Sequence, residues 1–288
     1  MDEQGALARL ADRVAGAGDD AAVIDGLVLT TDMLHESVDF PSGTTRYTAG
    51  WRAVGASLSD IAAMGAEAVA AVAVYGAPSF EWDALAAFVD GASDVCERTG
   101  SEYVGGDLDG HEEFTVATTV LGRTGTPVWR TGATPGEAVC VTGSLGRSAA
   151  ALDLFEAGEH ERANELFRFD PRVDAGQTLG AHATAMLDSS DGLARSLHQL
   201  ATASDCGFAI ESPLPVADAV EVVAADESER REMGLFFGED FELVCTLPGA
   251  RVPDLQATLE VPLHRIGAVT ESGVTLDGSV LPDRGYTH

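Results

Sequence analysis

The chain has 288 residues, 45% of them hydrophobic and 22% charged, so it can form a large buried core and is not a wholly disordered protein. It contains 47 acidic and 17 basic residues, all of the basic ones arginine, and its formal net charge is -30. This charge argues against nucleic acid and anionic membranes as partners, and the absence of lysine excludes a Walker A loop and a Schiff-base enzyme.

The first half of the chain predicts alternating strands and helices. Residues 27–31 form a short apolar run typical of a strand, and apolar residues at helical spacing predict a helix over 48–64. A continuous run of small apolar residues over 69–75 indicates a buried strand. A second helix is expected over 82–96, and alternation over 114–121 predicts another strand.

A turn-rich stretch at 130–137 marks the expected boundary between two domains, residues 1–132 and residues 133–288. The second half again mixes strands and helices. Its expected elements are a strand over 139–142 followed by a helix, a helix through Leu193, Leu197 and Leu200, and a strand over 241–247. Two halves of this kind indicate an α/β or α+β fold with two mixed domains.

The cysteines and the N-terminal sequence indicate the cellular compartment of the protein. Cys96, Cys140, Cys206 and Cys245 form no C-x-x-C pair, so we expect buried reduced thiols. The N-terminus lacks the apolar segment of a signal peptide, and no run approaches the roughly 18 apolar residues of a membrane span, so a soluble cytoplasmic protein is expected. The acidic composition indicates a halophilic source, because such a surface stays hydrated and screened in concentrated salt; a simply acidic mesophile protein is the alternative.

Five short acidic motifs lie beside small residues, and we expect most of them where a strand or helix meets a loop. Small neighbours allow a polyanion and its ions to approach the backbone, and carboxylate and hydroxyl oxygens are ligands that Mg²⁺ prefers. A group of carboxylates repels ATP unless cations lie between them, so such a site requires several metal ions. The motifs are Gly18-Asp19-Asp20, Thr30-Thr31-Asp32, Ser59-Asp60, Gly105-Gly106-Asp107 and Asp188-Ser189-Ser190-Asp191.

Taken singly, each motif is more simply explained as a turn, a helix cap or a solvated carboxylate. The functional interpretation therefore depends on the motifs occurring together. Trp51 falls on the apolar face of its helix and is expected in the core. Five histidines have no metal-ligand spacing and are interpreted as structural or surface groups: His111, His160, His182, His198 and His264.

Together and in this order, the motifs resemble those of the thiamine-monophosphate kinases. The most specific block is Leu58-Ser-Asp-Ile-Ala-Ala-Met-Gly-Ala66, and with Gly238-Glu-Asp-Phe-Glu-Leu243 the resemblance covers nearly the whole chain. It implies direct in-line phosphoryl transfer from ATP to thiamine monophosphate with several Mg²⁺ ions. It also implies a homodimer whose two N-terminal halves form a shared barrel, each followed by a C-terminal α/β half.

The resemblance assigns roles to residues of each motif. Asp32, Asp60 and Asp191 are the residues expected to be catalytic. The expected ATP contacts are Gly106, Asp107, Arg130 and Ser190. Arg130 suits this role because a planar cation can neutralise phosphate charge, although a surface ion pair is the alternative. The expected magnesium ligands are Asp20, Thr30, Thr31, Asp32, Asp60, Asp107, Asp188 and Asp191.

The resemblance is weaker around the acceptor. Asp39, Glu239 and Tyr286 are the residues expected near thiamine monophosphate. Kinases of this family usually have a histidine where this chain has Asp39, and His35 could replace it only if the loop is rearranged. These departures concern the recognition of the substrate rather than the metal site.

Two other interpretations remain open. The first is another ATP-using enzyme of the larger group that contains aminoimidazole ribonucleotide synthetase and selenophosphate synthetase. Selenophosphate synthetase normally relies on an N-terminal Cys or Sec with a Lys, and neither is present here. The second is a non-catalytic protein that binds nucleotide and magnesium. Consumption of ATP with thiamine monophosphate as the sole acceptor separates these interpretations.

Overall fold

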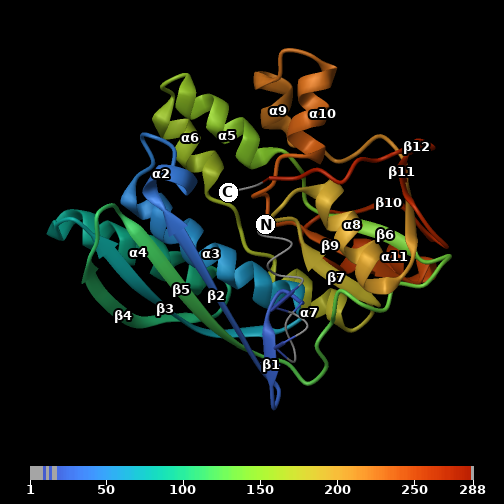
Figure 1. Cartoon of the computed structure of the whole chain (residues 1–288), viewed down its shortest axis with the longest axis horizontal. Helices are drawn as coiled ribbons and strands as arrows, with labels where there is room; N and C mark the ends of the chain where they lie inside the picture. Colours follow the sequence, from blue (N-terminus) through green and yellow to red (C-terminus); the bar gives the residue numbers. More distant parts are fainter. Residues whose placement is uncertain (1–8, 11–12, 15–17, 287–288) are drawn as a thin grey trace.

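A computed structural model describes residues 9–10, 13–14 and 18–286. The described chain forms two halves that lie side by side, each a sheet with helices packed on it (Figure 1). The mixed strand and helix content expected of both halves is confirmed. The first sheet ends at Arg123 and the second begins at Ala138, and the boundary expected between residues 132 and 133 stays a prediction.

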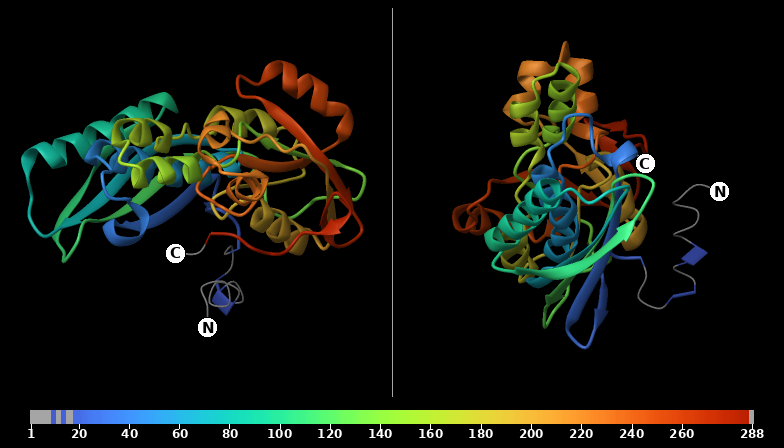
Figure 2. Two further views of the ribbon diagram at one scale, coloured as in Figure 1. Left: turned by 90° about the horizontal axis from the view of Figure 1, so that it is seen from above. Right: turned by 90° about the vertical axis from the view of Figure 1, so that its left-hand side faces the viewer.

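The N-terminal half contains a five-stranded sheet in the order β1-β2-β5-β3-β4, antiparallel except for the β3–β4 pair. Its two long helices, α3 and α4, lie on one side of this sheet (Figure 2). The elements are β1 (Ala22–Ile24), β2 (Leu27–His35), α2 (Glu36–Asp39), α3 (Arg46–Ala63), β3 (Glu67–Ala77), α4 (Trp82–Arg98), β4 (Glu102–Gly110) and β5 (Thr115–Arg123). All the elements expected in this half are therefore present, with β2 longer than expected.

Helix α3 is the central element of the molecule and is buried along most of its length. Gly50 of α3 and Gly91 of α4 let the two helices approach closely, since a Cβ at either position would lie 2.1 or 2.0 Å from a carbonyl oxygen of the other helix. Trp51 is buried in the core, as its helical position predicts. This packing holds α3 and α4 closely against each other.

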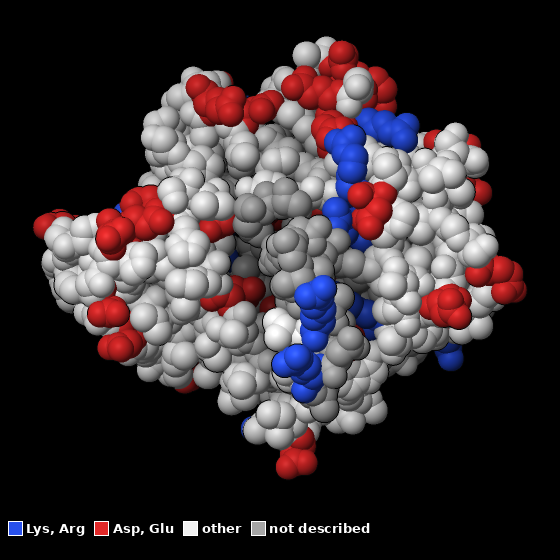
Figure 3. Space-filling view, in the orientation of Figure 1, with Lys and Arg blue, Asp and Glu red and all other residues white. Residues whose placement is uncertain are grey.

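The other face of the N-terminal sheet is uncovered, which corrects the expectation of a buried strand over 69–75. In β3 the side chains alternate between the helices and solvent, and Val72 and Val74 are 38% and 44% exposed. Figure 3 shows mainly uncharged atoms over this half, with acidic side chains in separate groups. We call this face the outer sheet face; its exposed apolar side chains are Ile24, Leu27, Leu29, Met33, Val72 and Val74.

The C-terminal half contains a seven-stranded mixed sheet in the order β12-β11-β8-β10-β6-β9-β7. Its elements are β6 (Ala138–Thr142), α5 (Arg147–Glu156), α6 (His160–Phe167), α7 (Val173–Gly180), β7 (Ala185–Asp188), α8 (Leu193–Ser204), β8 (Gly207–Ile210), α9 (Asp218–Val223), α10 (Glu227–Leu235), β9 (Leu243–Leu247), the 3-10 turn η1 (Gly249–Arg251), α11 (Val252–Thr258), β10 (Leu263–Thr270), β11 (Val274–Leu276) and β12 (Ser279–Val280). The strand expected over 241–247 begins only at Leu243, because Phe241 has a left-handed φ of 54° that no strand accommodates.

One hydrophobic core connects the two halves. It joins residues of α3 and the N-terminal sheet to residues of β6, α7, β7 and β9. Three cysteines, Cys96, Cys140 and Cys245, are buried as expected, whereas Cys206 is partly exposed. In the described part of the chain, every helix is too short or too polar to cross a membrane.

Candidate functional site

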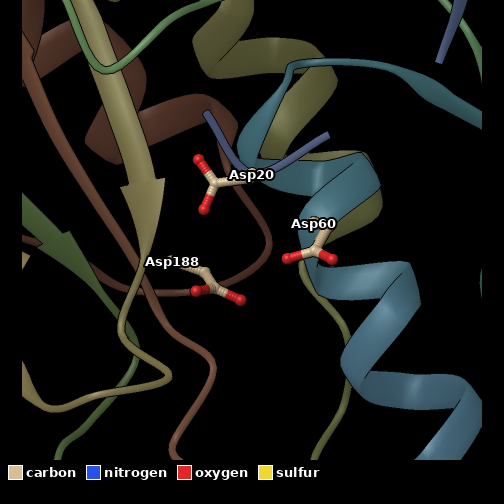
Figure 4. A group of neighbouring side chains, drawn as sticks. All are labelled: Asp20, Asp60 and Asp188. Carbon is tan, nitrogen blue, oxygen red and sulfur yellow. The ribbon is translucent and has the colours of Figure 1, made fainter. Parts of the chain in front are cut away.

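Three carboxylates from distant parts of the chain face one another where the two halves meet (Figure 4). Asp20 comes from the segment before β1, Asp60 from the last turn of α3, and Asp188 from the end of β7. One oxygen of each lies within 4.8 Å of the others. We call these three residues the carboxylate cluster.

Neighbouring polar groups hold the cluster in place. Thr30 Oγ1 donates a hydrogen bond to Asp60 Oδ2 at 2.5 Å. Arg130 donates from Nε and Nη2 to the carboxylate of Asp20 at 3.2 and 2.9 Å, and its backbone N–H donates to Asp19 Oδ1 at 2.6 Å. Arg130 is thus partly buried beside the cluster, rather than being part of an ion pair on the open surface.

The cluster is electrostatically unfavourable without a cation. Burial raises the pKa of Asp60 well above its usual range, and the neighbouring carboxylates of Asp32, Asp188 and Asp20 raise it further. Burial also raises the pKa of Asp188 to about 7, again with a contribution from Asp20. Like charges in a site that water does not screen repel one another strongly, and a cation between them removes that repulsion.

The donor set fits a hard divalent cation such as Mg²⁺. All three side chains offer carboxylate oxygens, which Mg²⁺ binds together with water and substrate phosphates. The buried hydroxyl of Ser59 lies beside Asp188 and makes no well-formed hydrogen bond within the described residues, so it offers one more oxygen near the cluster. The residues present therefore suit the ion that the sequence motifs predict.

Magnesium binding is expected to release protons at slightly acid pH. Because burial, with a contribution from Asp20, raises the pKa of Asp188 to about 7 in the folded metal-free protein from the 3.8 of an exposed aspartate, the folded state binds a proton that the unfolded chain does not. The stability of the metal-free protein should therefore fall as pH rises from about 4 to about 7, and Mg²⁺ should restore it. Titration with MgCl₂ in weakly buffered protein should acidify the solution at pH 6.5 but hardly at pH 8.5, and Asp188→Asn should reduce the release. Equal release at both pH values would contradict this assignment.

Asp32 extends the acidic region away from the cluster. Its Oδ2 accepts a hydrogen bond from Ser57 Oγ at 2.5 Å, and that hydroxyl lies 2.8 Å from Thr118 Oγ1. Burial raises the pKa of Asp32, and the carboxylate of Glu239 raises it further while the bond from Ser57 opposes the shift. Asp32 therefore lies between the cluster and the region of Glu239.

Two expected ligands lie on the outer sheet face instead. The hydroxyl of Thr31 donates to a backbone carbonyl oxygen of β5 at 2.8 Å. Asp107 and the neighbouring Gly106 lie within β4 and not at a strand end, and Asp107 is paired with the outward-facing Val74. Strands β2 and β4 are three spacings apart in the sheet, so Asp107 lies about 14 Å from Asp32 of the same chain. One chain does not bring Asp107 to the cluster.

The loop after β7 connects the cluster to the expected acceptor region. The backbone N–H of Ser190 donates to Asp188 Oδ1 at 3.3 Å, and the carbonyl oxygen of Ser190 accepts from the N–H of Glu239 at 2.6 Å. The carbonyl oxygen of Asp191 accepts from the N–H of Tyr286 at 3.0 Å. Ser190 and Asp191 thus lie between the metal ligands and the residues expected near the substrate.

The three residues expected near the acceptor lie in one region, although they come from α2, the segment before β9 and the end of the chain. Burial raises the pKa of the Tyr286 hydroxyl, and the carboxylates of Glu239 and Asp39 raise it further. Asp39 Oδ2 accepts a hydrogen bond from the backbone N–H of His35 at 2.6 Å. The ring of His35 lies 3.1 Å from the hydroxyl of Thr115, which places it against β5.

The structure adds two residues that the sequence interpretation missed, Arg52 and Ser57. Both lie on α3, where a polar side chain in a helix buried nearly all round is itself the signal of a specific role. The predicted residues that lie at or next to the carboxylate cluster are Asp20, Thr30, Asp32, Asp60, Arg130, Asp188 and Ser190. Three other predicted residues lie away from the cluster within one chain: Thr31, Gly106 and Asp107.

Comparison with known proteins assigns both halves to one family. The model for the N-terminal domain of AIR synthase related proteins matches residues 18–124, and the model for their C-terminal domain matches residues 134–277. The chain is 62% identical over 291 residues to a thiamine-monophosphate kinase from Halobacterium salinarum, with 100% of each chain covered. It is 41% identical over 283 residues to a thiamine-monophosphate kinase from Methanospirillum hungatei, with 94% of this chain and 92% of the relative covered.

Solved structures agree with the sequence comparison. The thiamine-monophosphate kinase from Stenotrophomonas maltophilia K279a superposes with a TM-score of 0.83 at 31% identity, covering 95% of this chain and 94% of that one. AaThiL complexed with AMPPCP and TMP superposes with a TM-score of 0.89 at 28% identity, covering 100% of this chain and 97% of that one. The fold is therefore shared over nearly the full length of these proteins.

Proposed function

The chain belongs to the thiamine-monophosphate kinases of the AIR synthase related family, and we propose that it transfers the γ-phosphoryl group of ATP to thiamine monophosphate, giving thiamine diphosphate. The observation that carries the proposal is the carboxylate cluster, since three converging carboxylates, one buried and two half-buried, require cations that can also bind polyphosphates. Binding of an ATP analogue by AaThiL, which has the same fold, supports it. We propose a cytoplasmic location, where ATP is available.

The acceptor needs no general base. The second pKa of a phosphate monoester is about 6, so the attacking oxygen is already largely ionised at neutral pH. The remaining difficulty is to bring two polyanions together in line, which requires positioning and neutralisation of charge. The reaction is therefore a direct transfer from ATP to the substrate, without a phosphorylated enzyme.

The residues of the cluster are proposed to hold magnesium. Asp20, Asp60 and Asp188 would be its central ligands, with Asp32 and Thr30 at the edge of the same acidic region. Magnesium bound there supplies positive charge to the transferred phosphoryl group. Arg130, Ser190 and Asp191 remain proposed contacts of the nucleotide phosphates and their ions.

The acceptor region suits the organic part of the substrate. The thiazolium ring of thiamine monophosphate carries a permanent positive charge and a flat face. Asp39 and Glu239 provide negative charge beside Tyr286, whose ring lies 5.3 Å from that of Phe237. A cationic ring is stabilised both by nearby carboxylates and by contact with aromatic faces.

The decisive experiment is an assay with ATP and thiamine monophosphate as the sole acceptor, in concentrated KCl with Mg²⁺. We expect formation of one thiamine diphosphate for each ATP consumed. Without turnover of this acceptor, the protein is either another ATP-using enzyme of the superfamily or a non-catalytic binder. Rapid mixing with γ-labelled ATP should give no labelled protein, and a burst of labelled protein would rule out direct transfer.

We also propose that the protein is a homodimer joined through the outer sheet face. A contiguous exposed apolar patch on a sheet is typical of an interaction surface, and a second copy would cover it with the same patch. Asp107 lies on this face and about 14 Å from Asp32 of its own chain. Asp107 would then reach the nucleotide of the partner chain.

Mixing two inactive variants tests this arrangement. If Asp60 and Asp107 act in one site from different chains, a dimer of one Asp60→Asn chain and one Asp107→Asn chain retains one intact site. Equimolar refolding of the two variants together should then give about a quarter of wild-type activity, since half of the dimers are mixed and each has one working site. No recovery in verified mixed dimers would place Asp107 in the site of its own chain or outside the site.

A further inference from the structure

Arg52 is the buried cation that connects the two halves beside the acceptor region. It lies in the middle of α3, with its side chain only 3% exposed. Its Nη1 donates to the carbonyl oxygen of Phe167 at 2.7 Å and to Ser148 Oγ at 3.2 Å. The guanidinium carbon lies 3.6 Å from the centre of the Phe167 ring. Its Nη2 donates to Glu239 Oε2 at 2.5 Å.

The backbone of Glu239 is fixed by hydrogen bonds that Arg52 does not itself make. Its φ is 67°, a left-handed value that a non-glycine residue holds only under constraint from its surroundings. Its N–H donates to the carbonyl oxygen of Ser190 at 2.6 Å, and its own carbonyl oxygen accepts from Ser148 Oγ at 2.6 Å. The main chain at Glu239 is therefore bound to the loop after β7 and to the start of α5.

The residues that follow Glu239 anchor the same segment. Asp240 accepts from the backbone N–H groups of Gly146 and Ser148 at 2.5 and 3.0 Å, where α5 begins. Phe241 stacks on Phe169 with ring centres 4.2 Å apart. The C-terminal half thus holds the backbone of this segment, and the contact with Arg52 fixes the direction of one side chain.

The carboxylate of Glu239 lies near a second carboxylate, that of Asp32. The carboxylate of Glu239 lies close enough to Asp32 and Tyr286 to affect both. Without a cationic partner it would turn away from Asp32 and lose its fixed direction. Arg52 bonds to Oε2, and Oε1 accepts no hydrogen bond from the residues that the structure describes.

We propose that Arg52 is a positioning residue for the acceptor: it holds the carboxylate of Glu239 across the junction, so that the cationic ring of thiamine monophosphate meets a fixed negative charge. This inference rests on the proposed function. Arginine suits the task because its planar guanidinium stays charged when buried, can donate to three partners at once and stacks on an aromatic face. The contacts with Phe167 and Ser148 leave it little freedom to move.

In a purely structural role, Arg52 would only join the two halves. Substrate kinetics distinguish this role from the positioning of Glu239 for the acceptor. Arg52→Met should raise KM for thiamine monophosphate by about tenfold or more while leaving KM for ATP within about twofold. Arg52→Lys should raise this KM less than Arg52→Met does, since lysine keeps the positive charge but lacks the planar guanidinium that donates to several partners. Arg98→Met is the matched control, because it removes an exposed ion pair with Asp170 that also joins the two halves, with Nε 2.7 Å from Oδ1.

The pair is confirmed or rejected by a double-mutant cycle. Glu239→Gln should raise KM for thiamine monophosphate, and Arg52→Met combined with it should add almost nothing, because the two residues act as one unit. If Arg52→Met alone does not fold, the double variant, which leaves no unpaired buried carboxylate, is compared with Glu239→Gln alone. Additive losses, or equal increases in KM for ATP, would overturn the inference. Failure of the wild-type protein to use thiamine monophosphate would instead overturn the proposed function.

Discussion

Replacement of Asp60 by asparagine is expected to lower kcat by about a thousandfold or more while the fold survives. The asparagine side chain has nearly the same shape as the aspartate and could still accept the hydrogen bond from Thr30. It would not supply the negative charge that a magnesium ion needs beside Asp20 and Asp188. The charge of the phosphates would then be incompletely neutralised in the transition state, which is where the rate is lost.

The same change should leave the metal-free protein at least as stable as the wild type. Burial and like charges already raise the pKa of Asp60 well above its usual range, so a neutral side chain relieves an unfavourable interaction. Thermal unfolding without Mg²⁺ and kinetics with Mg²⁺ are the two measurements. Asp90→Asn, an exposed change on α4, is the control and should alter neither. Near-normal turnover of Asp60→Asn would remove Asp60 from the site.

Withdrawal of salt is expected to destabilise the protein strongly. A net charge of -30 on 288 residues produces repulsion that is screened within about 3 Å in 1 M salt but only within about 10 Å in 0.1 M salt. If the added repulsion costs about 3 kcal/mol, the melting temperature falls by roughly 5 °C for a chain of 288 residues. Differential scanning calorimetry across KCl concentrations measures the change.

A control with sucrose distinguishes charge screening by KCl from the general stabilising effect of solutes on the melting temperature. Sucrose stabilises folded proteins by exclusion from their surface but screens no charge. Equal stabilisation by sucrose and by KCl would point to exclusion, whereas a response to KCl alone supports screening. Unchanged melting between 0.1 and 3 M KCl would reject the halophilic interpretation, even though the chain is 62% identical to a protein from Halobacterium salinarum.

The sequence predicts α3 well because a helix depends on a local pattern. Apolar residues at helical spacing identify the helix, and Asp60 lies in its last turn. The convergence of Asp20, Asp60 and Asp188 follows from the family resemblance and not from periodicity, since no local rule brings together residues from three separate elements. Trp51 is buried as predicted, because its place on the apolar face of the helix can be read from the local spacing.

Other features could not be derived from local patterns. The small apolar residues of β3 suit a buried strand and an exposed apolar face equally well, so the expectation that Val72 and Val74 are buried is wrong. Phe241 fits an alternating strand pattern, but stacking on Phe169 and a left-handed backbone take it out of the sheet. The partners of Arg52 lie far away in sequence, so only the fold identifies them.

The core that runs through both halves has a consequence for how substrates enter. Separating the halves as rigid domains about a hinge would expose the apolar groups that α3, α7 and β9 bury together. Heating should therefore melt the chain as one unit, and the catalytic cycle should leave the relative orientation of the halves unchanged. Access to the acidic region must then depend on short segments and individual side chains at its rim.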